Sequence, residues 1–107
     1  MAWSVEFVNE AAEDELRAMP RGIIAIFLRI TALIESAGPQ RLPPLYVKHL
    51  EGSIWELRMK DESGIARAAY VTASGQRVVV LHVFSKKTQK TPLRNLELAR
   101  KRAKELK

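Results

Sequence analysis

Residues 54–84, IWELRMKDESGIARAAYVTASGQRVVVLHVF, decide the fold. Three runs rich in aliphatic, aromatic and β-branched residues are separated by two short clusters that contain Gly64 and Gly75. Such runs are typical of β-strands, and short glycine-containing turns join antiparallel neighbours. The stretch therefore predicts three consecutive antiparallel strands. The unbroken apolar run of the third, at 77–84, favours a central place in the sheet.

One strand and two helices are expected before this stretch. Residues 3–8 alternate apolar and polar side chains, which predicts a half-buried strand. Asn9 is a suitable N-cap for a short helix that Pro20 ends. A longer helix follows, because apolar residues then recur at three- and four-residue spacing until Gly38, which is followed by proline.

The remaining segments complete the expected element order. Residues 41–52 contain a Pro-Pro pair and are interpreted as an irregular connector. Thr91 and Pro92 predict the start of a last helix, with the threonine as N-cap and the proline at the first helical position. The order β-α-α-β-β-β-α over one domain, residues 1–107, indicates an α+β fold in which a small antiparallel sheet packs helices on one face. The other face is then open to a ligand.

Basic residues are concentrated in the second half of this 107-residue chain, whose net charge is +6. Residues 1–53 have five Lys or Arg against seven Asp or Glu, a net charge of −2, and residues 54–107 have thirteen against five, a net charge of +8. This asymmetry favours a polyanionic partner, because cationic side chains that bind phosphates release condensed counterions. The alternative is a solvated helix face with a basic tail.

The composition excludes several kinds of site. The chain has no Cys and two His, so there is no thiolate nucleophile, and no metal site is expected. No glycine-rich phosphate loop or dinucleotide motif is present, and no cofactor is expected. The sequence also lacks a secretory leader and any run of about 20 apolar residues, which predicts a cytoplasmic protein without membrane contact.

Two arginines are the first candidates for chemistry. Arg58 and Arg67 lie on neighbouring predicted strands and can come near each other if those strands pair. Like charges repel unless an anion or a carboxylate lies between them, so the pair is interpreted as a phosphate clamp with forked donors. The alternative is that Glu56 and Glu62 pair with them.

A second basic feature, SKKTQK at residues 85–90, leaves the end of the last predicted strand. Its lysines, hydroxyls and amide suit contacts to an RNA or DNA backbone, although a solvated basic loop is the alternative. Further candidate RNA contacts are basic, imidazole or aromatic side chains: Lys48, His49, Tyr70, His82, Lys90 and Arg94. For Tyr70 and His82 the alternative is a structural role in the core.

Several of these segments together resemble a known family. LEGSIWELR at residues 50–58, then Arg67 and Tyr70, then VLHVFSKKTQKTP at residues 80–92 are similar to the phage-derived, HigB-like branch of the RelE/ParE toxins of bacterial type II toxin–antitoxin pairs. The resemblance covers nearly the whole chain and implies a RelE-like fold.

The resemblance implies a ribosome-dependent mRNA endonuclease that is blocked by a cognate antitoxin, often a helix-turn-helix protein. In this reaction the ribose 2′-hydroxyl attacks the adjacent phosphate. Matching positions give Arg58 and Arg67 the phosphate-stabilising role, and Lys86 and Lys87 position RNA or assist proton transfer, for which neighbouring cations would have to lower a lysine pKa. Many relatives place a Tyr or His near the C-terminal end as general acid or base, and none follows Phe84 here.

Two alternatives stay open. One is a ParE-like toxin that inhibits gyrase without nuclease activity. The other is a non-catalytic basic module that binds nucleic acid.

Overall fold

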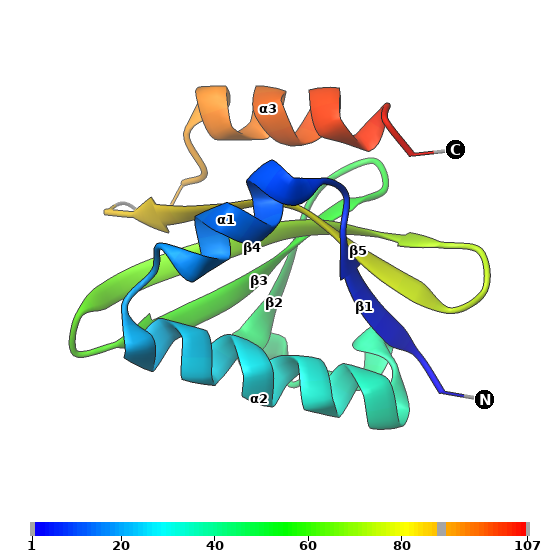
Figure 1. Ribbon diagram of the computed structural model, residues 1–107, viewed down its shortest axis with the longest axis horizontal. Helices are drawn as coiled ribbons and strands as arrows, with labels where there is room; N and C mark the ends of the chain where they lie inside the picture. Colours follow the sequence, from blue (N-terminus) through cyan, green and yellow to red (C-terminus); the bar gives the residue numbers. More distant parts are fainter. Residues whose placement is uncertain (1, 88–89, 107) are drawn as a thin grey trace.

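A five-stranded mixed sheet forms the centre of the computed structural model, which describes residues 2–87 and 90–106 (Figure 1). The spatial order of the strands is β1-β5-β4-β3-β2. Neighbours from β2 to β5 pair antiparallel, and β1 pairs parallel to β5. The strands are β1 (Ser4–Phe7), β2 (Val47–Glu51), β3 (Ile54–Asp61), β4 (Gly64–Ala73) and β5 (Arg77–Lys86). The three predicted strands of residues 54–84 are confirmed, and β5 is an interior strand with a neighbour on each side, as its apolar run indicates.

Helices lie on both faces of this sheet. Figure 1 shows α2 below the sheet and α3 above it, and α1 packs against β5. The α-helices are α1 (Glu10–Arg17), α2 (Arg21–Ala37) and α3 (Leu93–Ala103), and two 3₁₀ turns, η1 (Pro39–Arg41) and η2 (Pro44–Tyr46), follow α2. The α+β class is confirmed, while the arrangement differs from the expected one in which all helices share one face.

Local signals account for most helix boundaries. The Asn9 side chain accepts a hydrogen bond from the Ala12 N–H at 2.9 Å, so the predicted N-cap of α1 is confirmed. Gly38 ends α2 with a φ of 87°, a conformation that side chains with a Cβ rarely adopt. The last helix begins at Leu93, one residue later than expected, and Thr91 does not cap it.

Two features of the sheet were not expected from the sequence. Residues 47–51 form a strand, β2, where an irregular connector was predicted. The sheet is mixed rather than antiparallel throughout, because Ser4–Phe7 pairs parallel with the first half of β5. Both features depend on a partner strand and not on the local sequence pattern.

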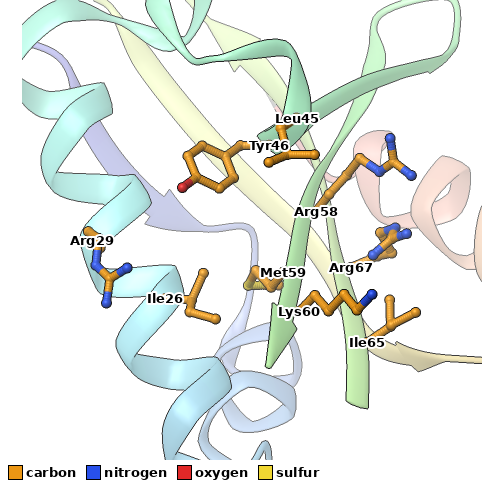
Figure 2. Close-up of a pocket in the computed structure, with 9 residues that line it drawn as sticks. All are labelled: Ile26, Arg29, Leu45, Tyr46, Arg58, Met59, Lys60, Ile65 and Arg67. Carbon is orange, nitrogen blue, oxygen red and sulfur yellow. The ribbon is translucent and has the colours of Figure 1, made fainter. Parts of the chain in front are cut away.

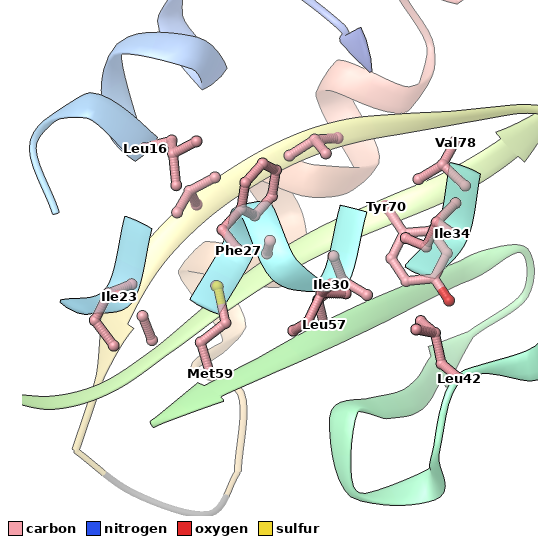
Figure 3. Packing of buried hydrophobic residues seen from close by; sticks show 14 residues of the cluster. Leu16, Ile23, Phe27, Ile30, Ile34, Leu42, Leu57, Met59, Tyr70 and Val78 are labelled. Carbon is pink, nitrogen blue, oxygen red and sulfur yellow. The ribbon is translucent and has the colours of Figure 1, made fainter. Parts of the chain in front are cut away.

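The larger hydrophobic core lies between α2 and the sheet (Figure 3). Phe27 and Ile30 of α2 pack there with Leu57 and Met59 of β3 and Tyr70 of β4. Complete burial of one such side chain stabilises the fold by roughly 1.5–3 kcal/mol. We call the face of the sheet that packs against this core the α2 face.

A smaller core lies between α3 and the opposite face, which we call the α3 face. Ala99 of α3 contacts a cluster that includes Ala69 and Val71 of β4 and Val79 and Leu81 of β5. These residues come from the second half of β4 and the first half of β5. The helix therefore packs on one end of its face and does not extend over the end near the β3–β4 turn.

Candidate functional site

The register of the sheet brings the predicted arginines together. Arg58 of β3 and Arg67 of β4 are direct Cα partners, so the expected proximity is confirmed. Lys48 of β2 is the Cα partner of Glu56. Because Glu56 stands two residues before Arg58 in β3, Lys48 and Arg58 lie on the same face of the sheet. Lys86 of β5 is the Cα partner of Ile65, two residues before Arg67 in β4. These side chains gather at the end of the α3 face that lies beyond α3, where Arg67 and Lys86 are buried and Lys48 is exposed.

A pocket of about 490 Å³ opens beside the second half of β3. Leu57 is the last β3 residue that pairs with β2, so the pocket lies beyond the end of the β2–β3 pairing. Figure 2 shows Arg29 of α2 and Tyr46 of η2 on one side of this strand, and Arg58 and Arg67 on the other. The apolar part of the lining is Ile26, Leu45, Met59 and Ile65, and Lys60 adds a fourth cation. We call it the cationic pocket, because four cations and no carboxylate are among the described residues that line it.

Glu56 is the carboxylate beneath this pocket, and it is fully buried. Its Oε1 lies 3.3 Å from Arg67 Nε and 3.6 Å from Lys86 Nζ. Its Oε2 accepts a hydrogen bond of 2.9 Å from the Thr91 hydroxyl. The alternative in which Glu56 and Glu62 pair with the two arginines therefore holds for Glu56 and Arg67 only, since neither Arg58 nor Glu62 forms an ion pair within residues 2–87 and 90–106.

The charges of Arg67 and Lys86 are perturbed by this arrangement. Burial lowers the pKa of Arg67, the neighbouring Glu56 raises it, and Arg58 lowers it further, with a net lowering. Burial also lowers the pKa of Lys86. Glu56 raises this pKa, the positive charges of Arg67 and Lys48 lower it, and the net change is a lowering. An arginine stays protonated in spite of such a shift, so Arg67 remains a cation in the pocket.

The two lysines at the end of β5 differ in access to solvent. The Lys86 side chain is completely covered, and its Nζ lies 3.3 Å from the Thr91 hydroxyl. Lys87 is exposed, as are Lys90 and Arg94 on either side of Thr91. Lys86 therefore lies inside the wall of the site, whereas the other three can reach a ligand on the surface.

Three predicted contacts lie away from the pocket. His82 is buried, with Nδ1 2.9 Å from Glu15 Oε1 and Nε2 2.8 Å from Asn95 Oδ1. Tyr70 is 3% exposed in the α2 core, where burial raises its pKa to about 12. His49 pairs with Trp55, whose face is the α2 face, and its Nε2 lies 2.8 Å from the Gly52 carbonyl oxygen.

The sequence had not indicated several residues of the site. Lys60 could have been found, because it shares a strand face with Arg58 at a spacing of two. Arg29 and Tyr46 come from other elements, and no sequence spacing connects them to β3. In the described part of the chain no group of three or more His, Asp or Glu side chains is placed to hold a metal ion. No described helix is long and apolar enough to cross a membrane.

Comparisons with known proteins agree with this architecture. A structure of a variant of the E. coli toxin RelE in the free state superposes with a TM-score of 0.65 at 16% identity, over 100% of both chains. The archaeal RelE–RelB complex from Pyrococcus horikoshii OT3 gives a TM-score of 0.59 at 19% identity, over 79% of this chain and 96% of that one. The fold is thus the RelE fold. No curated protein matches the sequence.

The sequence itself matches one family model, and the match covers residues 14–104. This range includes α2, all of the strands that line the cationic pocket, and α3. The chain therefore belongs to the family described as phage-derived Gp49-like proteins.

Proposed function

We propose that this protein is the toxin of a type II toxin–antitoxin pair and that it acts as a ribosome-dependent mRNA endonuclease. The observation that carries the proposal is the cationic pocket, in which Arg58 and Arg67 are adjacent and the lining cations outnumber the one buried carboxylate nearby. The RelE fold supports it, because the E. coli protein with this fold is described as a toxin.

The pocket suits cleavage by the ribose 2′-hydroxyl. Attack of the 2′ oxygen on the adjacent phosphorus breaks the bond to the 5′ oxygen and leaves a 2′,3′-cyclic phosphate and a 5′-hydroxyl. Negative charge grows on the phosphate oxygens in the transition state, and the forked N–H donors of Arg58 and Arg67 would stabilise it. The 2′-hydroxyl loses a proton and the 5′ oxygen gains one, and Lys60 and Tyr46 are the lining groups able to exchange a proton.

The expected partners follow from the same charges. An mRNA on a cytoplasmic ribosome would supply the phosphates. An antitoxin, as in the archaeal RelE–RelB complex, would need acidic side chains to neutralise the cationic pocket. We propose a helix-turn-helix protein for this partner, in line with the HigB-like resemblance.

Induced expression in bacteria tests the proposal. We expect growth arrest and new 5′ ends in translated mRNA, detected by primer extension, and we expect Arg58→Ala to relieve both effects. Arg41→Ala is the matched control, because Arg41 is an exposed arginine of η1 that does not line the pocket. Intact mRNA together with a DNA-damage response would instead indicate a gyrase inhibitor and would overturn the proposal.

A further inference from the structure

We infer that Glu56 is a positioning residue: it orients Arg67 for the phosphate and, through Thr91, links this orientation to the start of α3. The inference rests on the proposed function, because it concerns the same pocket. Its basis is the cluster that Glu56 forms with Arg67, Lys86 and Thr91.

A fully buried carboxylate requires a reason. Burial of an ionised group strongly destabilises the fold unless opposite charges and hydrogen bonds compensate for it. Glu56 has compensation from Arg67 and Lys86, and its other oxygen accepts from Thr91. The side chains of Glu56 and Lys86 are both 0% exposed. The carboxylate is thus placed where it acts on the pocket from below, without access to RNA.

Glu56 restricts the orientation of the Arg67 guanidinium group without accepting an aligned hydrogen bond from its Nε. Nε of Arg67 faces Glu56 Oε1 at 3.3 Å, and neither atom has an aligned hydrogen bond. Nη1 donates to the Ala66 carbonyl oxygen at 3.1 Å. Two of the three guanidinium nitrogens are therefore directed at the protein, which fixes the plane of the group. Nη2 is then the nitrogen left to donate to a phosphate oxygen in the pocket that Arg67 lines.

The same carboxylate also permits the cations to assemble before RNA binds. Arg58, Arg67, Lys86 and Lys48 lie close enough for their charges to influence one another. Like charges repel strongly in such a place, because buried groups are screened much less by water and salt than exposed ones. Glu56 offsets this repulsion, but it also competes with a phosphate for Arg67. Removal of its charge should therefore have opposite effects on binding and on catalysis.

Thr91 extends the cluster to the last helix. Its hydroxyl donates to Glu56 and lies 3.3 Å from Lys86 Nζ, and it stands two residues before α3 begins. The hydroxyl therefore joins β3, β5 and the approach to α3 at one point. A displacement of α3 would be transmitted to Glu56, and from Glu56 to Arg67.

Glu56→Gln tests this inference, since it preserves the shape and removes the charge. We expect roughly threefold tighter binding of a 2′-O-methyl RNA, which cannot be cleaved, because the pocket becomes more positive. We expect a roughly tenfold lower single-turnover rate of mRNA cleavage on programmed ribosomes, because Arg67 loses its fixed orientation. Glu62→Gln is the matched control: it changes the net charge equally at an exposed turn position and should leave the cleavage rate as in the wild type.

A second pair of variants guards against a folding defect. Thr91→Val removes the hydroxyl and Thr91→Ser retains it, so Thr91→Ser should cleave roughly fivefold faster than Thr91→Val if the hydrogen bond to Glu56 matters. Thermal unfolding followed by circular dichroism measures whether each variant is folded. Equal cleavage by the two Thr91 variants would overturn the inference, as would weaker or unchanged RNA binding by folded Glu56→Gln. If the wild type binds RNA but cleaves none, the proposed function fails. The RNA affinities of wild type and Glu56→Gln then still show whether the Glu56 carboxylate competes with a phosphate for Arg67.

Discussion

His82 of β5 and Glu15 of α1 are joined side chain to side chain, with 2.9 Å between Nδ1 and Oε1. The same carboxylate oxygen accepts from the Val83 backbone N–H at 3.0 Å and from Arg102 Nη1 at 2.8 Å. Nε2 of His82 faces Asn95 Oδ1 in α3. One carboxylate thus connects α1, β5 and α3, and it holds α3 over its end of the sheet.

Glu15→Gln should destabilise the fold. The variant keeps a hydrogen-bonding side chain but leaves Arg102, which is mostly buried, without its ion-pair partner. Loss of one partner of a buried pair costs roughly 3–5 kcal/mol, and we expect about 2 kcal/mol here because Glu15 is partly exposed. Urea denaturation at neutral pH measures the change. Glu13→Gln, in an exposed pair with Arg17, should change the free energy of unfolding by less than about 0.5 kcal/mol.

The effect of Glu15→Gln should depend on pH. Burial raises the pKa of Glu15, but hydrogen bonds from Arg102, His82 and the Val83 N–H lower it more, so the folded value lies below 4.5. A carboxyl group with a depressed folded pKa stabilises the fold above its unfolded pKa and loses this contribution as pH falls through the folded pKa. The stability difference between wild type and variant should therefore narrow below about pH 4.5. A difference that stays constant from pH 6 to pH 3 would contradict this assignment.

Gly22→Ala should destabilise the protein although Gly22 is helical. A Cβ at Gly22 would lie 1.7 Å from Asp61 Oδ2 and 3.0 Å from its Cγ. Asp61 cannot easily move, because its Oδ1 accepts from both the backbone N–H and the hydroxyl of Ser63. An unobstructed helical Gly→Ala change stabilises by up to about 1 kcal/mol. Here we expect a loss of roughly 1–2 kcal/mol from overpacking, measured by urea denaturation.

A double-mutant cycle with Asp61→Ala isolates this contact. Removal of the carboxylate makes room for the methyl group, so Gly22→Ala should become neutral or stabilising in the Asp61→Ala background. An equal loss in both backgrounds would show that the cost arises elsewhere, for example in the backbone of the first turn of α2.

A helix or strand could be predicted where its own residues show the polar and apolar periodicity of that element. Residues 54–84 and α2 do, and both were predicted. Strand β2 does not, because Lys48 and His49 are adjacent polar residues and a bulge between His49 and Glu51 interrupts the alternation. It is a strand because β3 offers hydrogen-bonding partners. The parallel pairing of β1 with β5 joins segments that lie far apart in the sequence, which no local pattern records.

The site was predictable where a short turn fixed the register. Arg58 and Arg67 flank the β3–β4 turn, so their adjacency follows once the two strands pair. The burial of Lys86 could not be seen, since it depends on Thr91 and Glu56 closing over its amine. His82 likewise looked available for RNA, but Glu15, from far away in the sequence, occupies its Nδ1. Long-range polar contacts therefore decided which basic residues remain free to act.

Lys60→Ala should reduce the salt dependence of RNA binding. Lys60 is an exposed cation that lines the pocket, and within the described residues it forms no ion pair, so a phosphate contact would displace only counterions. The slope of log K against log salt concentration for single-stranded RNA should fall in magnitude by roughly 0.7 for one lost phosphate contact. Fluorescence anisotropy of a labelled 2′-O-methyl RNA at several KCl concentrations measures it. Arg41→Ala removes an equal charge outside the pocket, and an equal fall in that variant would mean that the slope reports net charge rather than a contact at Lys60.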